Sequence, residues 1–482
     1  MHLGIDIGTS GVKAVLVDAA DRVVAEAAAP LFVSRPRPLW SEQAPEDWWQ
    51  AVVAALDALA AKASAEMAAV RGVGLSGQML GVALLDASDA VLRPALLWND
   101  GRASAECAEL HRRFPDFAGT VGCRAMPGFS APKLLWLSRH EPELLARTRR
   151  VLLPKDYVRL RLTGEAASDR ADASATLLMD TGRGDWAPEI VAACGIDRAC
   201  LPRLVESAEV AGEVRAEWAE RWGLPPGTPV VGGGGDNMCA AVGVGAVRAG
   251  DAYIGLGTSG VCFVANDAFL PAHGRGMHTH RHAVPGLYAQ NAVVLSAAGA
   301  LAWVAEVVGA SDIATLVASV EAAQLSPADT PVFTPYLAGE RTPHDDPHLT
   351  ATFSGLTHAA GPLHLVQAVM EGVALAIGDA HCALLSTGAP IARMSLTGGG
   401  ARSTLWARLI AAAVDMPLAV AASAHAGPAL GAARLARAGT GGPLIAGDPS
   451  DEQPRLVAPE PALAEALGGK RAAFDAHLRL AS

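Results

Sequence analysis

The sequence predicts an α/β protein built from two related domains, and three features of the chain support this prediction. Short apolar runs that are typical of strands alternate with longer segments of helical periodicity. A strand–turn–strand pattern at the N-terminus recurs near the middle of the chain. Runs of glycine at 232–235 and 398–400 separate an apolar run from a helical one, as at a strand end that leads into a helix.

Local patterns predict the first elements. Residues 3–7 and 12–17 are apolar runs joined by the turn GTSG at 8–11, which predicts a β-hairpin. A helix is expected over about 45–65 because Pro and Glu open it and apolar residues recur along it. Another strand is expected over 70–75, and strands and helices then continue to alternate along the chain.

The repeat divides the chain into two parts. Residues 4–11 read GIDIGTSG and residues 253–260 read YIGLGTSG, so the same unit opens two regions. A single recurrence near the midpoint indicates two related domains, because a solenoid would repeat many times at a short period. We place the boundary in the Ala/Gly-rich segment 240–250, which gives domains of residues 1–245 and 246–482.

Composition restricts the class of protein. Of the 482 residues, 51% are apolar and 18% are charged, which indicates a globular chain. A net charge of −11 without a run of basic residues disfavours nucleic acid and anionic membranes as partners. The seven cysteines are irregularly spaced with no CxxC pair, so we expect buried thiols in a reducing compartment. No apolar run approaches the roughly 18 residues of a membrane span and no charged leader is seen, so the prediction is a cytoplasmic protein.

Both GTSG turns are candidates for phosphate contact. Small residues let backbone N–H groups approach phosphate oxygens, and the hydroxyl groups add donors. A tight turn that needs glycine for its dihedral angles is the better explanation of either copy alone. The recurrence of the turn together with its flanking strands favours phosphate contact.

Asp6 stands where the second copy of the unit has Gly255, on a strand that is otherwise apolar. A buried carboxylate needs a partner, and hydrated Mg²⁺ that bridges nucleotide phosphates is one such partner. An aspartate that caps the turn is the alternative, and the sequence leaves both open.

The segment 230–237 brings a second carboxylate to the end of a strand. Four glycines precede Asp236, which opens a helical run and is a candidate general base for a substrate hydroxyl. The alternative is an ordinary helix N-cap, but a cap does not require four glycines, which cost conformational entropy. The segment 396–402, LTGGGAR, has the same form and suits an adenine ring or a phosphate, although a tight turn also explains it.

Other motifs are excluded or set aside. GxGxxG occurs at 72–77 and 255–260, but strand-like sequence follows both, so a Rossmann dinucleotide site is not expected. The chain also lacks GxxxxGK(S/T), HExxH and GxSxG. A cluster of histidines stands among glycines and prolines, and we interpret it as a solvated loop and not as a metal site. Its members are His273, His278, His280 and His282.

Together these motifs resemble the FGGY carbohydrate kinases, the family that includes glycerol kinase, gluconokinase and xylulokinase. The shared motifs are Asp6-x-Gly-Thr-Ser-Gly, the second GTSG, Gly-Gly-Gly-Asp236-Asn and Gly398-Gly-Gly-Ala. The finer resemblance is to the bacterial xylulokinases and covers nearly the whole chain, in segments 34–43, 97–102, 126–129, 131–136, 153–157, 335–344 and 427–433. It implies two duplicated actin/hexokinase-like (ribonuclease H-like) domains around a central cleft.

The resemblance also implies ligands and residue roles. It implies ATP and Mg²⁺ as cofactors, a small sugar as substrate, a homodimer, and no nucleic-acid or membrane partner. Asp236 is expected to be the general base, and Asp6 is expected to organise Mg²⁺ through water, with Asp236 as the second metal-facing carboxylate. The residues expected to contact the nucleotide are Thr9, Ser10, Lys13, Gly257, Thr258, Gly399, Gly400 and Ala401. Those expected to contact the sugar are Met79, Leu80, Asp236 and Asn237.

Leu80 departs from the pattern that the resemblance implies. Xylulokinases carry Gln-Met-His where this chain has Gln-Met-Leu at 78–80. The expected reaction is ATP-dependent phosphorylation of D-xylulose to D-xylulose 5-phosphate. The lost hydrogen-bond partner leaves open a kinase for another small ketose or polyol, such as ribulose or glycerol. A sensor that binds ATP and sugar without transfer is a further alternative, but it would have no need of both Asp6 and Asp236.

Overall fold

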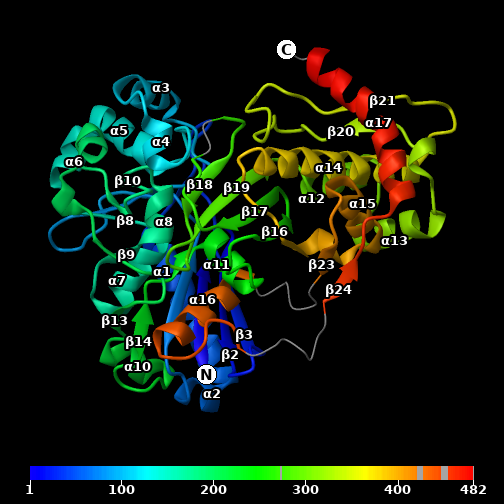
Figure 1. Ribbon diagram of the computed structural model, residues 1–482. Coiled ribbons are helices and arrows are strands. Elements are labelled where there is room, and N and C mark those ends of the chain that lie inside the picture. Colours follow the sequence, from blue (N-terminus) through cyan, green and yellow to red (C-terminus); the bar gives the residue numbers. More distant parts are fainter. Residues whose placement is uncertain (272–273, 421–426, 447–453, 481–482) are drawn as a thin grey trace.

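The computed structural model describes residues 1–271, 274–420, 427–446 and 454–480. The chain forms two lobes side by side, each built mainly from one half of the sequence (Figure 1). Each lobe is built on a mixed sheet of seven strands and is covered by helices. The predicted α/β class is therefore confirmed.

The first sheet carries the N-terminal hairpin. Its strands are β1 His2–Ile7, β2 Gly11–Val17, β3 Val23–Pro30, β5 Val73–Gly77, β13 Val210–Glu213, β14 Pro229–Val231 and β15 Gly234–Gly235. Their order is β13-β14-β5-β1-β2-β3, with β15 beside β5. β1 runs antiparallel to β2 and parallel to β5, so the predicted hairpin is confirmed.

The second sheet carries the repeated hairpin. Its strands are β16 Asp251–Leu256, β17 Gly260–Asn266, β18 His278–Arg281, β19 Tyr288–Val294, β22 Arg393–Thr397, β23 Leu418–Val420 and β24 Arg455–Val457. Their order is β18-β19-β17-β16-β22-β23-β24. Three antiparallel strands, β16, β17 and β19, are joined by β22 as the parallel neighbour of β16. β1, β2, β3 and β5 have this same arrangement in the first sheet, so the duplication is confirmed.

Helices cover both faces of the first sheet. α1 Pro45–Lys62 packs on the face that includes Ala14 and Leu16 of β2, whereas Val15 and Val17 face α16 Gly427–Gly439. The helices of the first half are α2 Ser64–Ala68, α3 Ser104–Arg113, α4 Phe117–Val121, α5 Ser130–His140, α6 Pro142–Arg147, α7 Pro154–Thr163, α8 Arg170–Ala175, α9 Pro188–Ala193, α10 Ala216–Trp222 and α11 Asp236–Gly243.

Helix α16 comes from the second half of the chain but lies on the first sheet, beside α11 (Figure 1). A Cβ at Gly4 would lie 1.9 Å from the carbonyl oxygen of Ala429, and a Cβ at Gly74 would lie 1.9 Å from that of Ala432. Only glycine lets the helix backbone approach β1 and β5 this closely. The chain thus returns to its first lobe, and the boundary between residues 245 and 246 stays a prediction.

Helix α14 Pro362–Leu385 forms the core of the second lobe. It packs on α15 Thr404–Val414 and on β19, and the lobe is completed by α12 Ala298–Val307, α13 Ile313–Ala323 and α17 Pro461–Leu480. Among the described residues it is the one helix long and apolar enough to cross a membrane, yet 83% of its apolar stretch is buried inside the protein. Its hydropathy is therefore that of a core helix.

The structure corrects the interpretation of the histidine segment 273–282. His278 and His280 lie on β18, are only 7% and 2% exposed, and do not belong to a solvated loop. The ring of His278 packs edge-on against Phe129 of the first lobe, with 5.3 Å between ring centroids. The edge strand is buried because the other lobe covers it, which local sequence cannot show. His273 lies outside the described residues. All seven cysteines are free thiols, but the expectation that they are buried is wrong for Cys382, which is exposed, and Cys200 is only half-buried.

Candidate active site

Three parallel strands of the first sheet end side by side at the candidate site. In the ladder, Asp6 of β1 lies beside Ser76 of β5, and Ser76 lies beside Gly234 of β15. Asp236 then opens α11 directly after β15. Parallel strands place their C-terminal ends at one edge of a sheet, so the two predicted carboxylates meet although they are distant in sequence.

Burial raises the pKa of both carboxyl groups, and the charge of Asp6 adds to the rise at Asp236. Burial raises the pKa of Asp6 to about 6, against the hydrogen bond that Ser76 Oγ donates at 2.8 Å and the charge of Lys13. Burial and the charge of Asp6 raise the pKa of Asp236 to about 7, against a hydrogen bond from the N–H of Asn237 at 2.7 Å. A carboxyl group with a pKa near neutrality is suited to accept a proton at neutral pH.

The segment that follows β5 lies against the start of α11. A Cβ at Gly235 would lie 2.5 Å from Met79 Cγ, and Asn237 Nδ2 donates to Met79 Sδ at 3.8 Å. Leu80 has a left-handed backbone with φ of 68°, and its carbonyl oxygen accepts a hydrogen bond from Lys133 Nζ at 2.8 Å. The residues predicted to contact the sugar therefore lie together beside the predicted base.

The first GTSG turn places its predicted residues differently. Ser10 is exposed, and Lys13 on β2 reaches toward β3, where its Nζ lies 3.0 Å from Glu26 Oε2. The Thr9 side chain points toward the segment after β5, where its Oγ1 donates to Gln78 Oε1 at 3.0 Å. The turn therefore contacts the segment after β5 through the Thr9 side chain, while the Ser10 side chain is exposed to solvent.

The nucleotide residues predicted in the second half form a separate group. They are Gly257, Thr258, Gly399, Gly400 and Ala401. The first two form the turn between β16 and β17, and the other three lie in the short helix η3 Gly399–Arg402 after β22. Because β16 and β22 are parallel neighbours, both glycine segments leave the same edge of the second sheet. Within the described ranges, no hydrogen bond or ion pair joins them to the group around Asp6 and Asp236.

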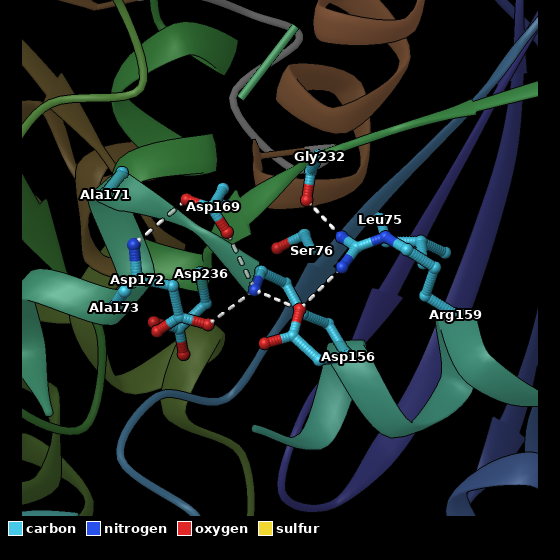
Figure 2. A network of polar contacts seen from close by, with 12 residues as sticks. Leu75, Ser76, Asp156, Arg159, Asp169, Ala171, Asp172, Ala173, Gly232 and Asp236 are labelled. Atoms are coloured by element: carbon cyan, nitrogen blue, oxygen red, sulfur yellow. Dashed lines mark hydrogen bonds and ion pairs between the residues drawn. The ribbon is translucent and has the colours of Figure 1, made fainter. Parts of the chain in front are cut away.

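A buried network of charges lies beside the predicted base (Figure 2). Lys155 Nζ, fully buried, lies 2.7 Å from Asp156 Oδ1 and 2.7 Å from Asp169 Oδ2. It also lies 3.0 Å from Asp172 Oδ2, and Figure 2 shows Asp236 next to this carboxylate. Burial and the neighbouring carboxylates raise the pKa of Asp172 to about 8 in spite of Lys155.

Two contacts tie this network to the glycine loop before Asp236. Arg159, which is also fully buried, donates to Asp156 Oδ1 at 2.8 Å and to the carbonyl oxygen of Gly232. A Cβ at Gly235 would lie only 3.0 Å from Asp172 Oδ1. The network therefore supports the loop that presents Asp236.

Sequence reasoning assigned no role to this network. The segment 153–157 entered only as part of the family resemblance. A usable signal was present, because α7 carries Lys155, Asp156 and Arg159 between apolar residues on every side. Charges on a helix without a polar face need partners inside the protein.

The pair of site carboxylates fits a hydrated divalent cation. Asp6 and Asp236 are half-buried, repel each other and have raised pKa values, so a cation would relieve an unfavourable arrangement. Mg²⁺ is usually held by one or two carboxylates together with water and substrate phosphates. No group of three or more His, Cys, Asp or Glu side chains in the described part of the chain could hold a metal alone.

The duplicated fold and the pair of carboxylates at the strand ends define a two-domain actin/hexokinase-like phosphotransferase. The FGGY family of carbohydrate kinases matches with its N-terminal domain over residues 1–243 and its C-terminal domain over residues 252–439. The chain belongs to this family and is a carbohydrate kinase, for which ATP is a substrate.

Relatives of known name cover almost the whole chain. It is 46% identical to the xylulose kinase of Escherichia coli K12, over 91% of this chain and 90% of that protein. It is 45% identical to the xylulose kinase of Klebsiella pneumoniae, over 96% of this chain and 93% of that protein. The crystal structure of a xyloylose kinase from Brucella ovis superimposes with a TM-score of 0.92 at 44% identity and covers 99% of both chains.

Proposed function

We propose that the protein transfers the γ-phosphate of ATP to D-xylulose and forms D-xylulose 5-phosphate. The observation that carries the proposal is the meeting of Asp6 and Asp236 at one sheet edge, beside Met79. The substrate name rests on the relatives called xylulose kinase, which match at 46% and 45% identity.

Asp236 acts as the general base in this proposal. It accepts the proton of the terminal sugar hydroxyl while the hydroxyl oxygen bonds to the γ-phosphorus of ATP. The bond from that phosphorus to the bridging oxygen breaks, and ADP leaves. A pKa of about 7 lets the carboxylate take up the proton and release it to solvent near neutral pH.

The remaining site residues position ATP and stabilise the charge on its phosphates. Asp6, with Asp236, would hold hydrated Mg²⁺, which supplies positive charge to the phosphates when bound. In this proposal, backbone N–H groups of both GTSG turns and of η3 would contact the phosphates and the adenine. Catalysis of this kind is mostly positioning and electrostatic stabilisation.

Replacement of the base tests the mechanism. Asp236→Asn keeps the shape of the side chain, so kcat should fall by about 10²–10⁴-fold while the Kd for the sugar stays within about threefold. The exposed Asp116→Asn is the matched control and should keep wild-type kcat. Near-normal turnover in Asp236→Asn would remove the proposed role.

A panel of sugars tests the substrate. ADP release with MgATP is measured for D-xylulose, L-xylulose, D-ribulose, L-ribulose, glycerol and gluconate. Leu80, whose apolar side chain stands beside the site, favours one second candidate, a kinase for another small ketose or polyol. Fastest turnover with D-xylulose supports the proposal. Fastest turnover with ribulose or glycerol would show that D-xylulose is not the preferred substrate and would leave the proposed mechanism unchanged.

Two further properties are proposed on the family resemblance. We expect a homodimer, which light scattering on the purified chain would reveal as twice the 49.3 kDa chain mass. We also expect a cytoplasmic location, where sugar and ATP are both available, and cell fractionation would test it.

A further inference from the structure

A chain of hydrogen bonds crosses from the first GTSG turn to the segment that follows β5. Trp98 Nε1 donates to Thr9 Oγ1 at 2.9 Å, and Thr9 Oγ1 donates to Gln78 Oε1 at 3.0 Å. Gln78 Nε2 in turn donates to Gln43 Oε1 at 2.8 Å. Residues from four separate parts of the sequence thus share one ordered path, which we call the Trp98–Gln43 chain.

The inner end of the chain is firmly anchored. Gln43 is 1% exposed, and its Oε1 also accepts from Trp48 Nε1 at 2.9 Å. Its Nε2 donates to the carbonyl oxygen of Thr9 at 2.8 Å and to that of Phe32 at 3.2 Å. A buried amide with every group bonded fixes the atoms around it. Gln43 therefore holds the turn by its backbone, while Gln78 holds it by the side chain.

The Thr9 hydroxyl is fully committed within this chain. A hydroxyl has one proton, and that of Thr9 goes to Gln78. In this arrangement Gln78 holds the hydroxyl proton, and the nucleotide contact expected of Thr9 stays a prediction. Among the described residues, the backbone N–H groups of Thr9 and Ser10 have no acceptor, so phosphate contact at this turn falls to the backbone.

The outer end of the chain is open to ligand. Trp98 is 46% exposed although its indole N–H is bonded, so much of the ring faces solvent. Within the chain, Gln78 is followed directly in sequence by Met79, which touches Asn237 and the loop before Asp236. Thr9 is therefore shared between a turn with free N–H groups and a segment beside the predicted base.

We propose that Thr9 is a positioning residue that couples sugar binding to nucleotide binding through the Trp98–Gln43 chain. The inference rests on the proposed function, in which the turn contacts phosphate and the segment after β5 contacts sugar. A sugar that moves Met79 also moves Gln78 and Thr9, and hence the N–H groups that contact phosphate. Each ligand then binds more tightly when the other is present, and the coupling is reciprocal.

The test measures the coupling factor, not stability or activity alone. Isothermal titration of the full chain gives the Kd of the sugar with and without a saturating β,γ-imido analogue of MgATP. The sugar used is the one with the fastest turnover in the panel. Wild type is expected to bind it on the order of tenfold more tightly with the analogue present. Thr9→Val keeps the shape of the side chain and removes the hydroxyl, and its coupling factor should fall to within about twofold of one.

Three comparisons separate a coupling role from a merely structural one. Thr9→Ser restores the hydroxyl and should restore the coupling factor, whereas Trp98→Phe removes one bond of the chain and should lower it partly. Thr148→Val loses a buried hydroxyl that is bonded to Leu144 and should keep the wild-type factor. Wild-type coupling in Thr9→Val overturns the proposal, and so does a variant that binds each ligand more weakly with the factor unchanged.

The sugar panel tests the proposed function separately from the coupling role of Thr9. If the panel shows fastest turnover with a sugar other than D-xylulose, the proposed substrate is wrong. The coupling factor is then measured with that sugar, and the role of Thr9 is still decided by Thr9→Val. A wild-type factor of one would refute the role of Thr9 whichever sugar is accepted.

Discussion

Replacement of Lys155 by methionine should reveal how the charge network below the active site is balanced. Lys155 and Arg159 carry two positive charges among the carboxylates of Asp156, Asp169 and Asp172, all fully buried. The pKa of Asp172, raised to about 8, makes it mostly neutral at pH 7. The two cations therefore balance two anions, and Lys155→Met leaves one buried carboxylate without a partner.

The magnitude follows from that imbalance. An uncompensated buried charge costs about 3–5 kcal/mol, which we expect as the loss in free energy of unfolding at pH 7. In the folded variant, one of the buried carboxylates can take up a proton, which removes the unpaired charge. The folded variant then binds one proton more than the unfolded variant does. Its stability then falls as pH rises. Each pH unit is worth about 1.36 kcal/mol, so the loss should be about 2.7 kcal/mol smaller at pH 5 than at pH 7.

Urea unfolding, followed by tryptophan fluorescence at pH 5 and pH 7, measures both quantities. Most of the ten tryptophans lie in the first half of the chain, so the signal reports the lobe that holds the network. Lys133→Met is the matched control, because Lys133 is also fully buried but donates only to carbonyl oxygens, those of Leu80, Leu96 and Leu97. Burial lowers the pKa of Lys133 to about 7, so the loss for Lys133→Met should differ by only about 0.4 kcal/mol between the two pH values. Equal losses at both pH values for Lys155→Met, or a loss below about 1 kcal/mol at pH 7, would refute the charge balance.

Two other substitutions test the loop and the strand between the lobes. Gly235→Ala would place a Cβ 2.5 Å from Met79 Cγ and 3.0 Å from Asp172 Oδ1, so the loop must shift, and kcat should fall on the order of 100-fold. Steady-state kinetics with wild-type kcat would contradict this. Burial lowers the pKa of His280 to about 4, so its contribution is present above pH 6.5 and is lost as pH falls toward 4, by at most about 3 kcal/mol. His280→Phe should flatten the unfolding free energy over that range, and an unchanged pH dependence would speak against it.

Local sequence patterns account for the parts of the fold that form within a few residues. Both hairpins and the strand-to-helix turns at Asp236 and Gly399 follow from apolar runs and glycines, which act over a few residues. The recurrence of GTSG predicted the duplication, because a copied unit keeps its own local signals. The family motifs, spread over the chain, also named the two carboxylates that the structure brings to one edge.

Tertiary structure alone decided the rest. Burial of His278 and His280, the charges around Lys155, and the direction of the Thr9 hydroxyl all depend on segments far away in the sequence. The return of α16 to the first sheet does too, since it needs the open backbone of Gly4 against a helix from the other half. The physical reason is the same in each case. Whether a polar group meets water, a charge or another side chain is set by what packs against it, and local pattern carries no record of that neighbour.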